Sequence, residues 1–269
     1  MIAVLSGLVL LALAAAPAAL SSTTTSKPLA GRVVFLGDSI TYAGQYVEFV
    51  ETGSRLFSPT GELEVLNLGL PSETVSGLSE PGHAGGAFPR PDLQERLSRV
   101  LQKTHPDVVI ACYGMNDGIY YPFGEERFQQ FQAGIRRLRD QVTAAGARIL
   151  FLTPPVFDPL PIQAKTLPAG QSTYPHPYVG YNEVLDRYSE WLRSQRARGW
   201  EVVDVHGPIN QFLAAQRQRE PQFCLARDGV HPDVTGHWLM AQALLTYLGV
   251  PAEQVTSADQ MLAHSPAAA

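Results

Sequence analysis

Short apolar segments alternate with amphipathic segments along most of the chain, and this alternation strongly limits the possible folds. Five segments are short, apolar and rich in β-branched residues, as expected of strands buried on both faces: 33–37, 64–68, 107–113, 148–153 and 201–205. Helical periodicity covers 41–52, 92–103, 125–145, 179–198, 208–217 and 234–248. Strands joined by helical crossovers predict an α/β fold, a three-layer α/β/α sandwich around a mostly parallel five-stranded sheet.

The N-terminal 20 residues differ from the rest of the chain. Residues 1–20 are apolar, and the first charged residue is Lys27. We interpret residues 1–20 as a signal peptide with a small-x-small cleavage site at 16–18, followed by a polar linker over 21–30. We therefore expect a secreted or periplasmic protein. No Lys or Arg follows Met1 directly and the stretch is long enough to span a bilayer, so an uncleaved N-terminal membrane anchor is the alternative.

The rest of the chain is expected to form one globular domain over 31–250 and a loosely packed tail over 251–269. The net charge is −5 and 45% of the residues are hydrophobic, which argues against disorder and against the dense positive charge of nucleic-acid binding. Cys112 and Cys224 are too few for a disulfide scaffold. Export would allow them to pair, but we expect two separate buried thiols. The sequence leaves the oligomeric state open.

Two motifs contain the elements of nucleophilic catalysis. Gly37-Asp38-Ser39 follows the first predicted strand, where a serine either presents its hydroxyl at the sheet edge or caps a helix. Near the C-terminal end, Asp228 precedes His231 by three residues. A carboxylate at that spacing can orient the imidazole and stabilise its protonated form. The pair could instead ligate a metal, but no further ligands stand at a recognisable metal spacing.

Two further loops follow predicted strands. Asn116 follows the third strand, where its side-chain amide either donates to a developing oxyanion or closes an Asx-turn. The segment 67–74 follows the second strand and either presents backbone N–H groups or forms a plain turn. Because ligands bind at the carboxyl ends of parallel strands, we expect these loops to meet at one site.

The order and spacing of these motifs resemble the SGNH hydrolases, also called the GDSL esterase/lipase superfamily. The matching residues lie within about residues 33–245 and are Gly37-Asp38-Ser39, Gly114-Met115-Asn116-Asp117 and Asp228 to His231-Pro232. The resemblance implies a flavodoxin-like sheet and a serine ester hydrolase that acts through an acyl-enzyme, without cofactor or metal. It implies Ser39 as nucleophile, His231 as base and Asp228 as its orienting carboxylate. The oxyanion hole would comprise Ser39, Ser72 and Asn116.

One position departs from the family pattern. Counting from Asn67 to Thr74, the position that holds glycine in the family holds Ser72. A positive φ there would be costly for a residue with a side chain. We expect Ser72 to donate its backbone N–H from an ordinary conformation, with Gly69 or Gly77 taking over after a local shift as the alternative.

Two acidic residues flank these oxyanion donors. Glu73 follows Ser72 and Asp117 follows Asn116. We expect both carboxylates to brace the loops rather than react.

Aromatic residues near the motifs suggest a surface for sugar rings, although each is also an ordinary core residue. The possible substrate-binding residues are Tyr120, Tyr121, Phe88, Arg90 and Trp238. Export, a polar loop-rich rim and the precedent of the family that the chain resembles together favour the removal of short acyl groups, chiefly acetyl, from carbohydrates. The alternatives are a lysophospholipase or thioesterase, and a non-catalytic carbohydrate-binding module on the same fold. We expect a small-molecule or carbohydrate ester as partner, with no nucleic acid and no membrane after signal removal.

Overall fold

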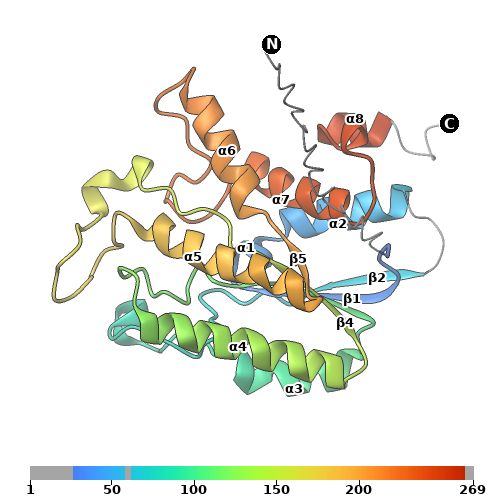
Figure 1. The fold of residues 1–269 in the computed structure, drawn as a ribbon, viewed down its shortest axis with the longest axis horizontal. Helices are drawn as coiled ribbons and strands as arrows, with labels where there is room; N and C mark the ends of the chain where they lie inside the picture. The colour runs from blue at the N-terminus through green and yellow to red at the C-terminus, as the bar shows by residue number, and fades with distance from the viewer. Residues whose placement is uncertain (1–26, 58–61, 264–269) are drawn as a thin grey trace, which may run out of the picture.

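The computed structural model describes residues 27–57 and 62–263 (Figure 1). The predicted signal peptide and most of the predicted linker lie outside the described residues. A five-stranded sheet has the order β2-β1-β3-β4-β5, and every pair of neighbouring strands is parallel. The strands are β1 (Gly31–Gly37), β2 (Leu63–Asn67), β3 (Val108–Cys112), β4 (Arg148–Leu152) and β5 (Glu201–Val203). The predicted parallel sheet is confirmed, with boundaries shifted by one or two residues.

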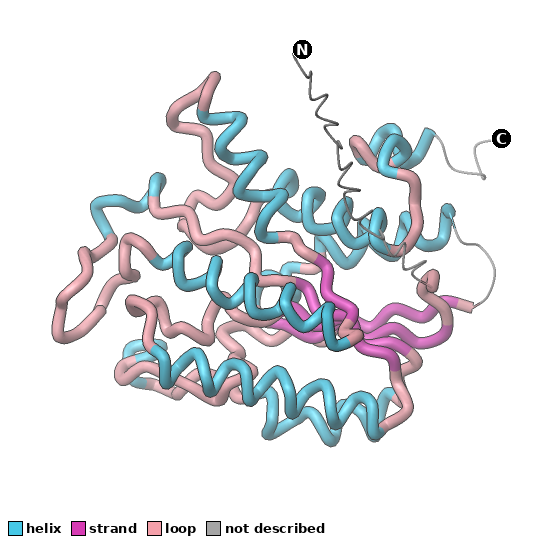
Figure 2. The backbone as a smooth tube through the Cα atoms, in the orientation of Figure 1, coloured by secondary structure: helices cyan, strands magenta, loops and turns pink. Residues whose placement is uncertain are grey.

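Helices cover both faces of the sheet (Figure 1). One face carries α2 (Gln45–Phe57) and α7 (Val234–Tyr247), which pack on each other. The other carries α3 (Leu93–Thr104), α4 (Glu125–Ala144) and α5 (Tyr181–Ser194). The remaining helices are α1 (Ser39–Ala43), α6 (His206–Arg217), α8 (Ala258–Ala263) and four 3₁₀ segments, His83–Gly86, Leu160–Lys165, Gln195–Arg198 and Ala252–Gln254. The three-layer sandwich is confirmed, and its longest loops gather on one side of the molecule (Figure 2).

The helix predicted over 41–52 is two helices. The backbone breaks at Gly44, whose φ is 87° and whose N–H donates to the carbonyl of Thr41. Glycine adopts this left-handed conformation without steric cost, so it ends α1 and lets α2 start in a new direction. The break leaves Ser39 in the first turn of its own short helix.

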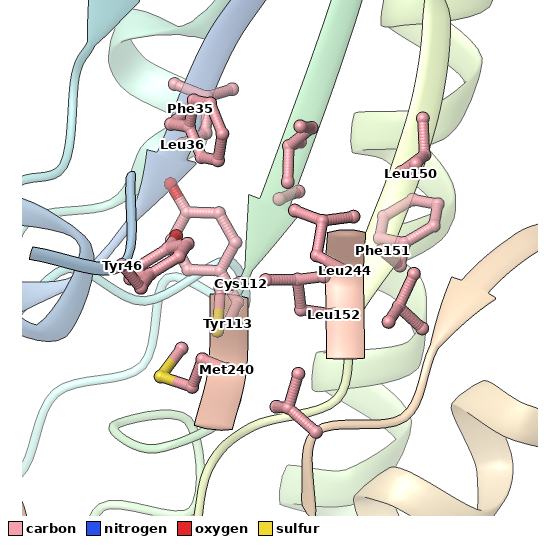
Figure 3. Close-up of a cluster of buried hydrophobic side chains, with 14 of the residues drawn as sticks. Phe35, Leu36, Tyr46, Cys112, Tyr113, Leu150, Phe151, Leu152, Met240 and Leu244 are labelled. Atoms are coloured by element: carbon pink, nitrogen blue, oxygen red, sulfur yellow. The ribbon is translucent and has the colours of Figure 1, made fainter. Parts of the chain in front are cut away.

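The core consists of the sheet and the apolar faces of its helices. Val33 to Leu36 of β1 are fully buried, which explains why the strand reads as an unbroken apolar run. Figure 3 shows Tyr46 of α2 and Met240 and Leu244 of α7 packed over the strands on one face.

The described part of the tail packs more closely than expected. Val255 and Met261 are both buried, and the Met261 sulfur lies against Gly53 of α2. These two side chains anchor the tail to the domain, while the other side chains over 251–261 are exposed or half-buried. Within residues 27–57 and 62–263, no helix is long and apolar enough to cross a membrane.

Gly134 lets α4 approach the loop that follows β2. A Cβ at this position would lie 2.1 Å from the carbonyl oxygen of Val75. We expect Gly134→Ala to lower the free energy of unfolding by about 1–3 kcal/mol, because overpacking against backbone outweighs the higher helix propensity of alanine. Urea unfolding measures the change. Arg137→Ala, on the exposed face of α4, is the control and should change stability by less than about 0.5 kcal/mol. A stabilised Gly134→Ala variant would contradict the close approach.

Candidate active site

Ser39, His231 and Asp228 form a continuous hydrogen-bonded chain. His231 Nε2 lies 2.8 Å from Ser39 Oγ, and His231 Nδ1 lies 2.6 Å from Asp228 Oδ2. The other carboxylate oxygen, Asp228 Oδ1, accepts from the backbone N–H groups of Val230 and His231. The carboxylate is thus fixed by the turn that carries the histidine. This is the geometry in which an imidazole takes a proton from a hydroxyl.

Asp228 holds its charge at this position. Partial burial would raise the pKa of this carboxyl, but hydrogen bonds from His231 and from the backbone lower it below its ordinary value. An ionised carboxylate at Nδ1 favours the tautomer with the proton on Nδ1, which leaves Nε2 free to accept. The side chains of His231 and Asp228 are 49% and 56% exposed, so the site opens directly to solvent.

Three potential oxyanion donors lie on the segments that follow β1, β2 and β3. The backbone N–H groups of Ser39 and Ser72 donate to no acceptor among the described residues. Leu70 N–H donates to Gly37 O at 2.9 Å, which ties the β2 loop to the end of β1. Asn116 is 4% exposed, and its Nδ2 donates at 3.3 Å to the carbonyl of Glu73, the residue after Ser72. The loops of three adjacent strands therefore meet here, as the sheet order requires.

Ser72 adopts the conformation that the sequence argued against. Its φ is 66°, in the left-handed region, so the expectation of an ordinary conformation is wrong. The two glycine alternatives are engaged elsewhere: Gly69 N–H donates to Asn67 Oδ1 at 3.0 Å, and Gly77 lies against the Asp92 carboxylate. Ser72 keeps a free N–H at the cost of backbone strain.

Buried carboxylates hold the loop that follows Ser72. Glu73 is fully buried, pairs with both Arg96 Nε and Nη2, and accepts from Tyr113 Oη at 2.6 Å. Burial raises the pKa of Glu73, against the lowering effect of Arg96. Asp117 Oδ1 accepts from the N–H groups of Val75 and Ser76 at 3.0 and 2.9 Å. The predicted bracing role of Glu73 and Asp117 is confirmed.

Asp38 brings a buried carboxyl next to the nucleophile. It caps α1, and its Oδ1 accepts from Ile40 N–H at 2.9 Å. Burial, with a smaller contribution from the nearby carboxyls of Asp117 and Glu73, raises the pKa of Asp38 to about 7 against the lowering effects of the Ile40 hydrogen bond and His231. The carboxyl edge of the sheet therefore concentrates buried acidic groups beneath Ser39.

The five proposed substrate-binding residues lie in different settings. Tyr120 and Arg90 both contact Asn116 Oδ1, and Arg90 is only 7% exposed. Tyr121 lies 5.0 Å, centroid to centroid, from the ring of Tyr174 in the 154–178 loop. Trp238 packs edge-on against Phe49 of α2. Phe88 is 56% exposed beside His83.

The sequence reasoning missed Tyr42 and the partner of Arg90. Tyr42 is 65% exposed and stands three positions after Ser39 on α1. Starting the predicted helix at 41 hid this relation, which a helix beginning at Ser39 would have shown. Arg90 forms an ion pair with Glu80, at 2.6 Å. No periodicity in the 70–91 loop points to that pair.

Among the described residues, the cysteines form no disulfide and the acidic groups form no metal site. Cys112 is buried, Cys224 is partly buried and both are free thiols. The expectation that they are separate is confirmed, but the expectation of burial holds for Cys112 alone. No group of three or more His, Cys, Asp or Glu side chains within 27–57 and 62–263 is arranged to hold a metal ion.

A parallel α/β sheet with a serine–histidine–aspartate chain at its carboxyl edge is the architecture of a serine hydrolase. A family model matches residues 35–239, and the chain belongs to the GDSL-like Lipase/Acylhydrolase family. The predicted resemblance is confirmed, and the protein is a carboxylic ester hydrolase. No curated protein matches the chain.

Solved structures share the fold. BT4096, a gut microbial diltiazem-metabolizing enzyme, is 26% identical with a TM-score of 0.62. The alignment covers 84% of this chain but 48% of BT4096, so this chain spans about half of that protein. Axe2, an acetylxylan esterase from Geobacillus stearothermophilus, is 22% identical with a TM-score of 0.59, over 86% of this chain and 98% of Axe2. Catalytic mutants of Axe2 replace a serine, an aspartate or a histidine.

Relieving the strain at Ser72 should stabilise the protein. We expect Ser72→Gly to raise the free energy of unfolding by about 1 kcal/mol, because glycine adopts a positive φ without steric cost. Esterase activity should persist, since the backbone N–H remains. Ser72→Ala is the matched control: it removes the hydroxyl but keeps the strain, so it should not stabilise. Equal stabilisation by both substitutions in urea unfolding would show that the Ser72 hydroxyl, and not backbone strain, is the source of the destabilisation.

The buried carboxyl of Asp38 should make stability depend on pH. Its pKa is raised from 3.8 to about 7, so the folded state retains a proton that the unfolded state has lost, and stability falls as pH rises from about 4 to about 7. Asp38→Asn keeps the capping oxygen and removes the titration. Between pH 4 and pH 8, the free energy of unfolding of the variant should rise by about 2–4 kcal/mol relative to that of wild type. Urea unfolding across pH measures it. A difference in unfolding free energy that stays constant over this pH range would contradict the raised pKa.

Proposed function

We propose that the protein is a serine esterase that removes short acyl groups, chiefly acetyl, from carbohydrates through an acyl-enzyme. The observation that carries the proposal is the chain from Ser39 Oγ through His231 to the Asp228 carboxylate, at 2.8 and 2.6 Å. Binding alone needs no aligned base and nucleophile, so this chain argues against a non-catalytic carbohydrate-binding module.

Acylation follows from the geometry. Ser39 Oγ attacks the ester carbonyl carbon while His231 Nε2 takes the hydroxyl proton. The Asp228 carboxylate stabilises the imidazolium that forms. As the tetrahedral intermediate collapses, the bond to the leaving oxygen breaks, and His231 returns the proton to that oxygen. The alcohol departs and the acyl group stays on Ser39.

Deacylation reverses these roles. His231 takes a proton from water, the resulting hydroxide attacks the acyl carbon, and the acid leaves as Ser39 regains its proton. In both steps the negative charge on the carbonyl oxygen would be held by the N–H groups of Ser39 and Ser72 and by Asn116 Nδ2. One such donor contributes about 3 kcal/mol to the transition state. No step uses a metal or cofactor.

Three features support a carbohydrate ester as substrate. His231 and Asp228 are half exposed, so a bulky alcohol component can extend into solvent. Tyr42, 65% exposed near Ser39, offers an aromatic face of the kind on which sugar rings pack. The fold is shared with an acetylxylan esterase.

We also propose that the mature enzyme acts outside the cytoplasm, as a secreted or periplasmic protein. The uncharged apolar stretch over 1–20 and the small-x-small sequence at 16–18 support this proposal. N-terminal sequencing of the exported protein tests it. A first residue near 19–21 is expected, whereas a retained Met1 would favour the membrane-anchored alternative.

Hydrolysis of p-nitrophenyl acetate, butyrate and octanoate, with acetate release from acetylated xylan, tests the activity. We expect preference for acetate, release from xylan and loss of at least about a thousandfold in kcat in Ser39→Ala, because the nucleophile is gone. Ser98→Ala, on the exposed face of α3, is the matched control and should keep full activity.

The other outcomes separate the alternatives. Preference for octanoate would assign a lipid substrate of the lysophospholipase or thioesterase kind. A folded wild-type protein that binds xylan but hydrolyses none of these esters would overturn the esterase proposal in favour of a binding module.

A further inference from the structure

Arg90 is a buried cation held on three sides. Its Nε and Nη2 donate to the two carboxylate oxygens of Glu80 at 2.6 and 2.7 Å, and its Nη1 donates to Asn116 Oδ1 at 3.0 Å. The guanidinium carbon lies 5.4 Å from the centroid of the Tyr120 ring. With 7% of the residue exposed, the guanidinium is almost fully enclosed by protein. These contacts leave it unable to reach a sugar as the sequence suggested.

The contact with Asn116 determines which way the side-chain amide points. Asn116 Oδ1 accepts from Arg90 Nη1 and from Tyr120 Oη, at 3.0 and 3.1 Å. A flipped amide would place two N–H donors against a guanidinium and would be strongly unfavourable. The two donors therefore keep Nδ2 on the opposite side, against the Glu73 carbonyl at 3.3 Å. One N–H of Nδ2 meets that carbonyl, and the other remains available.

The charge of Arg90 also acts on the amide. Burial alone would lower the pKa of Arg90, but the hydrogen bonds with Glu80 raise it above its ordinary value, so the guanidinium stays protonated. A cation at the carbonyl oxygen of a carboxamide polarises the group and makes its N–H a stronger donor. Because the surroundings are buried, water screens this effect little.

We propose that Arg90 is a positioning residue for catalysis: it fixes the orientation of the Asn116 amide and strengthens its N–H toward the oxyanion. This inference rests on the proposed esterase function and adds to it a residue that does not touch substrate. The backbone supports the same arrangement, since Ile119 and Tyr120 have φ values of 48° and 58°. These strained residues hold the Tyr120 ring beside the Arg90 guanidinium and its hydroxyl against Asn116 Oδ1.

The main test is a double-mutant cycle between Arg90→Met and Asn116→Ala, read as kcat and KM for p-nitrophenyl acetate. Arg90→Met should lower kcat about 10- to 100-fold with KM changed less than about threefold, because only the transition state carries the oxyanion charge. In the Asn116→Ala background, the same substitution should lower kcat less than about threefold. An equal loss of kcat in both backgrounds would overturn the proposal.

Two further variants distinguish a positioning role of Arg90 from a merely structural role of its ion pair with Glu80. Glu80→Gln removes the ion pair but keeps the cation, so at a similar loss of thermal stability it should retain more kcat than Arg90→Met. Arg148→Met removes a comparable arginine–glutamate pair, with Glu201, far along the strands from the site. It should lower stability without lowering kcat. Equal kcat for Glu80→Gln and Arg90→Met would indicate a structural role alone.

The proposed role of Arg90 can fail while the proposed esterase function stands, and the measurements tell these results apart. If the wild-type protein hydrolyses acetate esters through Ser39 and folded Arg90→Met keeps its kcat, the positioning role fails while the esterase stands. If wild type hydrolyses no ester, both proposals fail.

Discussion

Parallel pairing of β1 with both β2 and β3 is the constraint on which the site depends. The register sets Phe35 opposite Asn67 on one side and Gly37 opposite Cys112 on the other. The three strands consequently end at the same edge, and the loops that follow them meet there. The nucleophile, the Ser72 turn and the Asn116 amide come one from each loop. These three groups are tens of residues apart in the sequence, and it is the order of the strands in the sheet that brings them together.

Much of the fold and of the catalytic chain could be predicted from the sequence, since both depend on local patterns. Strands buried on both faces read as apolar runs, and Asp228 precedes His231 by one turn, so their hydrogen bond is local. The α1–α2 break was missed because helical periodicity continues through Gly44, and only its φ of 87° reveals the turn. The sequence argues against a positive φ at Ser72 because conformational preference reflects the strain of that backbone. It does not reflect the tertiary contacts that hold the strained turn in place.

The misjudged role of Arg90 has a different physical origin. An arginine in a long polar loop is usually exposed, and nothing near it in the sequence indicates burial. Its partner Glu80 stands ten residues away, and Asn116 stands 26 away on another strand's loop. Contacts of this kind are set by how loops fold over the sheet edge, so periodicity and motif spacing carry no signal for them.

The site combines an exposed catalytic chain with a buried set of supports. His231 and Asp228 face solvent, whereas the groups that hold the oxyanion donors, among them Glu73, Asp117 and Arg90, are buried. This division has a physical reason. The histidine chain must exchange protons and meet a bulky substrate, so exposure serves it. The donors must point in a fixed direction before charge develops, and burial keeps their polarising neighbours unscreened. Strained residues at 72, 119 and 120 are partly buried and adjoin this buried set in the chain. Burial of the braces is therefore what lets a serine take the place of a glycine in the turn without loss of the free N–H.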